Sequence, residues 1–135
     1  MKRMKPPTRH LLPLVALLLV SCGDSANMIG PGNQLEVTNA TDSFQWQVTA
    51  LENVTQVLNY SWVNTGATAD VNQSSALGGG TATVEVKDAG GAIVYTRSLA
   101  ENGTFTTSAG SPGTWAVTVS LRQAQGTVNF RLQKP

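Results

Sequence analysis

Apolar and polar residues alternate along most of the chain beyond residue 34, and this two-residue period restricts the fold more than any other feature of the sequence. In residues 43–51, Phe44, Trp46 and Val48 share one face, while Gln45, Gln47 and Thr49 share the other. Successive side chains of a β-strand point to opposite faces, so this pattern indicates strands with one buried and one solvated face. No stretch keeps a 3.6-residue period long enough for a helix. We therefore expect an all-β domain.

Turn residues divide this region into short strands. We expect strands near 34–39, 43–51, 54–64, 67–73, 80–88, 91–99, 103–108, 113–122 and 126–133. Asp88-Ala89-Gly90-Gly91 supplies the residues of a short hairpin turn, Asn102-Gly103 and Ser111-Pro112-Gly113 mark the next two reversals, and Gly78-Gly79-Gly80 a looser one. Eight or nine half-buried strands at this spacing predict an antiparallel β-sandwich, of jelly-roll or immunoglobulin-like type, over residues 34–135.

The first 21 residues have the three parts of an export signal. Four cationic residues, Lys2, Arg3, Lys5 and Arg9, precede an apolar stretch from Leu11 to Val20, and small residues follow it. The stretch is too short to span a bilayer by itself, since a transmembrane helix needs about 20 apolar residues. We therefore expect residues 1–21 to be a signal helix that is removed from the mature protein.

The end of this signal, Leu19-Val20-Ser21-Cys22, resembles the lipobox of bacterial lipoproteins at all four positions. The resemblance implies cleavage between Ser21 and Cys22, diacylglycerol on the Cys22 sulfur, and often an acyl chain on the new amino group. Two or more chains anchor a protein stably in a bilayer, whereas one does not. The expected protein is thus exported and membrane-anchored, without any other cofactor. In a Gram-negative host the outer membrane is favoured, because Gly23 replaces the aspartate that marks inner-membrane retention in enteric bacteria.

Residues 22–33 are predicted to form the lipidated cysteine and a flexible tether. From Gly23 to Asn33 the chain is small and polar, with glycine and proline, which is the composition of a linker. Eleven residues at about 3.5 Å each would keep the domain within roughly 40 Å of the bilayer.

The residue inventory of the mature chain excludes several function classes. Five cationic residues oppose eight carboxylates after residue 21, a formal charge of −3, so no basic patch for nucleic acid is expected. The single histidine, His10, is in the signal, and the single cysteine is the expected lipid site. Histidine-dependent nucleophilic sites and His/Cys zinc sites are therefore absent from the expected mature protein. The remaining carboxylates are scattered singly, and we expect no enzyme.

Calcium is the one metal that turn aspartates could bind in such a domain. Asp70, Asp88 and Glu101 are the candidates, but none lies in a dense Asp-x-Asp pattern. Ordinary turn chemistry explains Asp88 as well, because an aspartate at a turn accepts hydrogen bonds from its own backbone. We expect no metal site.

The stretch from Thr81 to Pro135 also resembles the C-terminal half of small exported β-sandwich domains of the prepeptidase C-terminal and Golgi-dynamics types. The resembling features are the strand ending in Val86-Lys87-Asp88, the Gly90-Gly91 hairpin, Ile93-Val94-Tyr95, Gly103-Thr104-Phe105, and Pro112-Gly113-Thr114-Trp115 before Val117 and Val119. The resemblance implies a carrier, adaptor or accessory module and transfers no catalytic residue.

Two function classes remain from the sequence. The first is a lipoprotein that presents a small, non-catalytic β-sandwich as a binding module for an envelope glycan or protein. The second is a structural accessory subunit of a cell-envelope complex. The candidate ligand-binding residues are Tyr60 and Trp62, which share one face of strand 54–64 with Leu58. Either this face belongs to the core, or a one-residue phase change exposes the two rings as a platform on which sugars stack.

Overall fold

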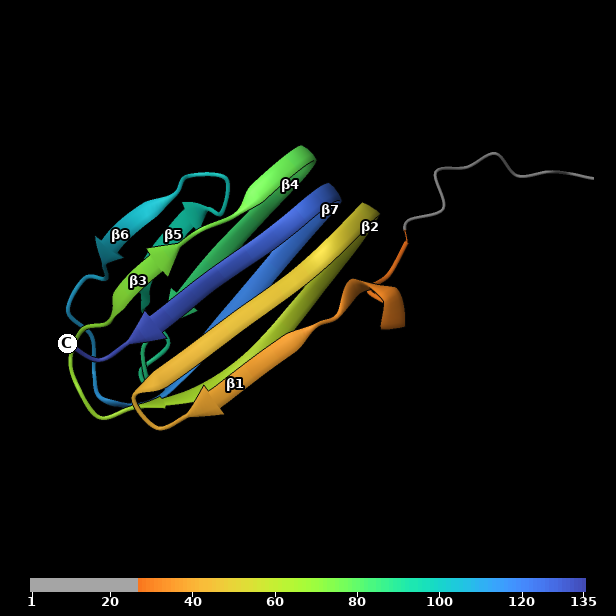
Figure 1. Ribbon diagram of the computed structural model, residues 1–135. Helices are drawn as coiled ribbons and strands as arrows, with labels where there is room; N and C mark the ends of the chain where they lie inside the picture. Colours follow the sequence, from red (N-terminus) through yellow and green to blue (C-terminus); the bar gives the residue numbers. More distant parts are fainter. Residues whose placement is uncertain (1–26) are drawn as a thin grey trace, which may run out of the picture.

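Two long strands, β2 (Ser43–Asn64) and β7 (Gly113–Gln133), organise the fold and pair antiparallel along almost their whole length. The structure is a computed structural model and describes residues 27–135. Both strands bend sharply near their middle, so each contributes one half to each of two sheet layers (Figure 1). The predicted signal, the lipobox-like motif and Cys22 lie outside the described residues.

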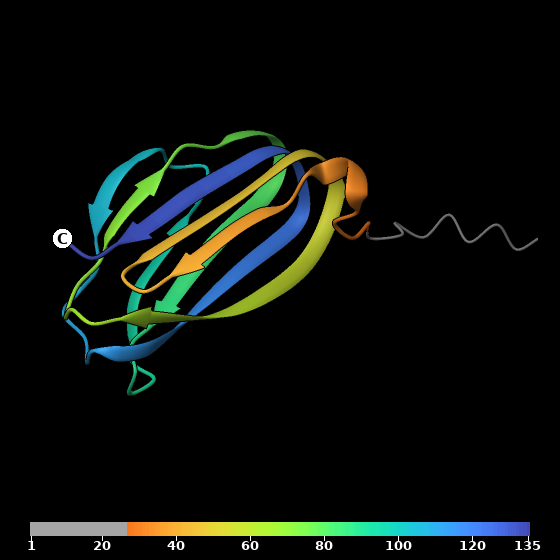
Figure 2. The same ribbon diagram turned by 60° about the horizontal axis from the view of Figure 1, so that its bottom comes forward.

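Five shorter strands complete the two layers. They are β1 (Glu36–Ala40), β3 (Asp70–Gln73), β4 (Ala76–Lys87), β5 (Ile93–Ser98) and β6 (Gly103–Thr106), and a 3-10 turn, η1 (Pro31–Asn33), precedes them. The first layer has the order β1-β2-β7-β3-β6, using residues 43–48 of β2 and 126–133 of β7. In the second layer, residues 56–64 of β2 pair with β7, which pairs with β4, which pairs with β5 (Figure 2).

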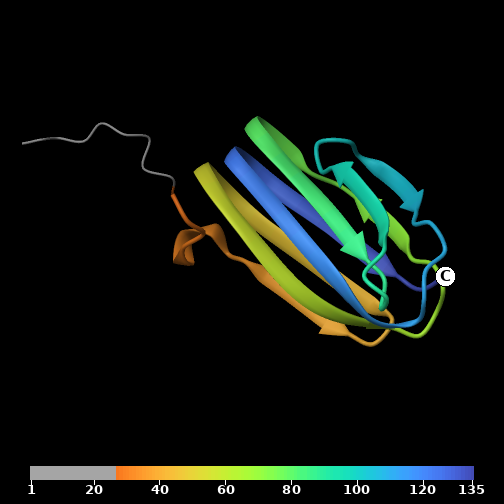
Figure 3. The same ribbon diagram turned by 180° about the vertical axis from the view of Figure 1, so that it is seen from behind.

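The bends of β2, β7 and β4 lie together at one end of the sandwich (Figure 3). We call residues 50–53, 78–80 and 122–126 the bend end. Ala50, Asn53 and Gln123 have positive φ there, and the ladders shift register on either side. Gly80 and Gly126 are required because an added Cβ would come within 2.1 Å of the Gln123 carbonyl oxygen and 2.2 Å of the Ala76 carbonyl oxygen, respectively.

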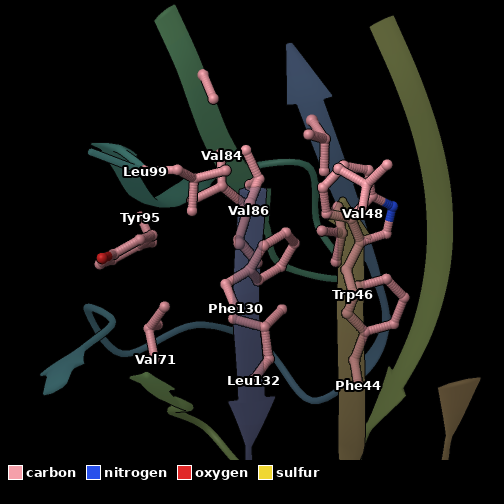
Figure 4. Packing of buried hydrophobic residues seen from close by; sticks show 14 of the residues in the cluster. Phe44, Trp46, Val48, Val71, Val84, Val86, Tyr95, Leu99, Phe130 and Leu132 are labelled. Atoms are coloured by element: carbon pink, nitrogen blue, oxygen red, sulfur yellow. The ribbon is translucent and has the colours of Figure 1, made fainter. Parts of the chain in front are cut away.

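The alternating apolar residues meet between the layers and form one core (Figure 4). Phe44 and Trp46 of β2 lie against Phe130 of β7, with the Trp46 and Phe130 rings stacked at a centroid distance of 5.8 Å. Val84 and Val86 of β4 close the core from the second layer, and all five side chains are fully buried. The inward faces are those that the two-residue period predicts for strands 43–51, 113–122 and 126–133.

The predicted antiparallel β-sandwich is confirmed, but nine predicted strands correspond to seven. In two places, two predicted strands are one continuous bent strand: β2 covers 43–51 and 54–64, and β7 covers 113–122 and 126–133. Residues 78–80, predicted as a loose turn, are a bend within β4. The reversals at 88–91, 102–103 and 111–113 are confirmed, because each lies at the boundary of two observed strands.

The opposite end of the sandwich carries the loops at residues 41–42, 65–69, 88–92 and 107–112, and we call it the loop end. Backbone hydrogen bonds join these loops, including Gly110 N to Ala67 O at 2.7 Å and Ala89 N to Ser111 O at 3.3 Å. The C-terminus lies at the same end (Figure 1). Within residues 27–135, no helix has the length and apolar character needed to cross a membrane.

Candidate binding site on an outer sheet face

The structure places the two aromatic candidates, Tyr60 and Trp62, toward the interior. Trp62 is fully buried, its indole N–H donates to Ala40 O at 3.0 Å, and its ring packs edge-on against Trp115 with centroids 5.9 Å apart. Tyr60 is half-buried, and its hydroxyl oxygen accepts a hydrogen bond from Trp46 Nε1 at 2.8 Å. Trp62 has no free ring face, so the hypothesis that it forms a stacking platform is wrong and the core interpretation holds for it.

Tyr60 and Trp62 face the core because the register shifts of β2 against β7 lie before them in the strand. The register of β2 against β7 shifts between Val48 and Gln56, at the bend, and then runs without interruption from Gln56 to Asn64. Leu58, Tyr60 and Trp62 are therefore paired with Val119, Val117 and Trp115, which face the core. The register shifts lie before the aromatic residues and produce no net change of phase, because even-numbered residues of β2 face the core on both sides of the bend.

The three carboxylates considered for calcium lie in separate places. Asp70, in β3, accepts a hydrogen bond from Thr106 Oγ1 at 3.2 Å, and Glu101 forms an ion pair with Arg97 at 3.0 Å. Asp88 accepts backbone N–H bonds from Gly90, Ala92 and Ser111 at 2.9–3.0 Å. These bonds, that from Ser111 above all, lower the pKa of the Asp88 carboxyl below its ordinary value. Among residues 27–135, no three His, Cys, Asp or Glu residues group as metal ligands would.

A polar cluster closes the side of the sandwich between β3, β5 and β6. Tyr95 donates its hydroxyl proton to Gln73 Oε1 at 2.5 Å, and Gln73 Nε2 donates to the carbonyls of Ser98 and Glu101. Burial raises the pKa of the Tyr95 hydroxyl. The Arg97 guanidinium lies 3.9 Å from the Phe105 ring centroid. These groups are mostly bonded to one another, so the cluster is best explained as a structural closure of the core.

The outer face of the first layer is a polar array that crosses five strands. Its central row crosses all five strands, because ladder partners place Thr38, Gln45, Arg131, Asn72 and Thr104 side by side. A row on one side holds Glu36, Gln47 and Asn129, and a row on the other holds Ala40, Ser43, Gln133, Asp70 and Thr106. Residues directly opposite in a ladder point to the same face, and these alternate with the buried core residues. We call this surface the amide face.

Arg131 is the only cation of the amide face and stands in its central row. It is exposed and flanked by two amides, Gln45 and Asn72, with no ion pair or side-chain hydrogen bond to it among the described residues. Its guanidinium can therefore donate several hydrogen bonds in a fixed planar geometry to a ligand. The Gln45 amide offers donors and an acceptor, and Asn72, whose Nδ2 also donates to Thr104 Oγ1 at 3.1 Å, keeps a second N–H and its carbonyl oxygen for a ligand. The array suits a ligand that is rich in hydroxyl and amide groups.

Sequence reasoning assigned the members of this face to solvated strand faces without bringing them together. Gln45, Gln47, Asn129 and Arg131 all follow from alternation, but the pairing of β2 with the end of β7 joins residues more than 80 positions apart. The sequence feature that could have indicated this surface is the enrichment of amides on the polar faces of the predicted strands 43–51 and 126–133.

The tether prediction needs a correction for residues 27–33, which are bonded to the domain. Asn27 forms a parallel bridge with Val54, and Ile29 N donates to Gln56 Oε1 at 3.0 Å. Asn33 Nδ2 donates to the carbonyls of Thr49 and Ala50 at 3.1 and 2.8 Å. A glycine- and proline-containing segment can dock in this way when side-chain amides bond the carbonyls that a bent strand leaves unpaired.

Neither a scan against protein-family models nor a search of curated proteins finds a match for this chain.

Proposed function

We propose that this chain is a membrane-anchored lipoprotein whose β-sandwich is a non-catalytic binding module for an envelope glycan, with the amide face as its binding surface. The observation that carries the proposal is the row of amides and hydroxyls around the unpaired Arg131 on a five-stranded face. Its members stand about 4.8 Å apart between neighbouring strands, a spacing fixed by the sheet. A rigid array of this kind binds without the entropic cost of ordering a loop.

The chemistry of the face favours a glycan with both hydroxyl and acetamido groups. Gln45, Asn72 and Asn129 can each donate to and accept from such groups, and Arg131 can donate to a carboxylate or hydroxyl oxygen of the same chain. The face has no aromatic residue, so affinity would come from hydrogen bonds. The expected single-site affinity is correspondingly modest, and many copies anchored in one membrane would raise it through avidity.

Co-sedimentation with purified peptidoglycan sacculi tests the proposal, using a soluble form that begins at Gly23. We expect the wild-type domain to sediment with the sacculi and Arg131→Gln to bind about tenfold more weakly or worse, because a charge-assisted hydrogen bond is worth about 1.5–3 kcal/mol.

Arg122→Gln is the matched control, since Arg122 is an exposed cation paired with Thr81 in the second layer and the substitution removes the same charge. Equal loss in both variants, or no sedimentation of the wild-type domain, would contradict the glycan proposal.

A free strand edge supports the second candidate, a structural accessory subunit of a cell-envelope complex. Along β2, Asn27 occupies the edge at Val54 and Asn39 Nδ2 bonds Ser61 O, but no described segment pairs with the edge at 57–59. Val57 is 60% exposed beside it. A partner could add a strand there. Cross-linking in the native membrane followed by mass spectrometry would then identify one stoichiometric protein neighbour through residues 57–59.

A further inference from the structure

The attachment of residues 27–33 at the bend end fixes how far the domain can move from a lipidated Cys22. The amide nitrogen of Asn27 bonds Asn53 O at 3.3 Å, and its carbonyl oxygen accepts from Thr55 N at 3.1 Å. Asn27 Nδ2 also donates to Glu52 O at 2.9 Å. The described chain therefore begins beside the tip of the β2 bend, and its first residue points its amino side toward that tip.

The short length of chain between Cys22 and Asn27 restricts how the domain can be oriented relative to the bilayer. Only residues 23–26 separate Cys22 from Asn27, so five Cα steps span at most roughly 17 Å. The half of β7 from residue 113 to 122, which runs from the loop end to the bend end, is about 30 Å long at 3.3 Å per residue. A tether of about 17 Å at the bend end excludes a domain that stands upright on its loop end, because that orientation would place the bend end about 30 Å above the bilayer. A free tether over residues 23–33 would have reached roughly 40 Å and allowed any orientation.

We infer that the bend end faces the lipid headgroups and the loop end is displayed away from the membrane. This inference rests on the proposed lipidation of Cys22. The bend end suits the position, because only two of its residues, Glu52 and Arg122, are charged and their charges are opposite. The amide face then runs along the membrane normal, where a glycan layer above the headgroups can reach it.

Quenching by lipid headgroups tests the orientation in the full acylated protein, reconstituted in phosphatidylcholine vesicles that contain a headgroup-spin-labelled lipid. Acylated Cys22 has no free thiol and is the only cysteine, so an introduced cysteine is labelled alone. A fluorophore at Gln125→Cys, exposed at the bend end, should lose most of its fluorescence. A fluorophore at Ala109→Cys, exposed at the loop end, should keep nearly all of it.

The two proposals fail in different ways. Protein that does not float with the vesicles would contradict lipid anchoring itself. Protein that floats, but whose two labels are quenched equally or in the opposite order, would overturn the orientation alone. The double variant Asn27→Pro/Gln56→Ala removes the bonds from Asn27 to Asn53 O and Glu52 O and the bond from Ile29 N to Gln56 Oε1, and it should reduce the difference between the two labels. An unchanged difference would overturn the role of this attachment. Each variant is first checked for an unchanged β-type circular dichroism spectrum and melting transition.

Discussion

Replacing Trp62 by alanine should be among the most damaging substitutions in the domain. The side chain is fully buried, packs edge-on against Trp115, and donates its indole N–H to Ala40 O. Truncating a buried tryptophan costs about 3–5 kcal/mol, a range that includes the lost packing and the cavity. In the variant, the Ala40 carbonyl loses its donor, but it lies at the end of β1 where water can reach it. The lost hydrogen bond therefore adds little to the expected loss of stability. The expected loss is about 4 kcal/mol, a large part of the roughly 5–15 kcal/mol that stabilises a typical domain.

Urea unfolding of the soluble domain, followed by circular dichroism, measures this loss. With an m-value of about 2 kcal/mol per molar urea, the midpoint should fall by roughly 2 M. Trp62→Phe keeps most of the volume and should cost about 1–2 kcal/mol. Val57→Ala, on the exposed face of the same strand, should change the stability by less than about 0.5 kcal/mol. An unchanged midpoint for Trp62→Ala would show that the strand has the opposite phase and that Trp62 is exposed.

Three further predictions concern the bend end, the loop end and the core. Gly126→Ala should lower stability by at least about 2 kcal/mol, because its φ is +110° and the new Cβ would meet the Ala76 carbonyl. The neighbouring Gly78→Ala, with no atom closer than 4.0 Å, should be nearly neutral in the same urea experiment, and equal effects would refute the geometry. Asp88 has a lowered pKa in the folded state, so it stabilises the fold above its unfolded pKa and this contribution is lost as the pH falls through the folded pKa. The melting temperature of Asp88→Asn should therefore lie below that of the wild type at neutral pH and approach it in acid; a constant difference would refute the assignment. Tyr95→Phe leaves Gln73 Oε1 without its donor and should cost about 1 kcal/mol by thermal unfolding, whereas no change would indicate that the hydroxyl is solvated.

Alternation predicted the faces of the strands but could not show where one strand ends. A bend with positive φ at Ala50 and Asn53 interrupts the two-residue period in the same way as a turn does. The single strand β2 therefore has the pattern of two strands, and the same holds for β7 around Gln123. Turn residues were informative where the chain reverses, as at Asp88, and misleading at Gly78–Gly80, where glycine permits a bend and close backbone contact instead of a turn.

The candidate site was harder to predict than the fold, because a polar face becomes a surface only through strand pairing. The period assigned Gln45 and Arg131 to solvated faces, but their adjacency depends on the register of β2 against β7, which the pattern within either strand does not specify. The attachment of residues 27–33 was missed for a related reason. Asn33 lies in a segment of linker composition, and its side-chain bonds to Thr49 and Ala50 depend on a bend that the period cannot describe.

Intact mass spectrometry of the protein extracted from membranes with detergent tests the central claim, lipid anchoring through Cys22, most directly. We expect a polypeptide that begins at Cys22 and carries the added mass of diacylglycerol, with or without a further acyl chain on its amino group. In Cys22→Ser, the unprocessed precursor should accumulate without lipid. A wild-type protein that keeps residues 1–21, or one with an unmodified Cys22, would contradict the account.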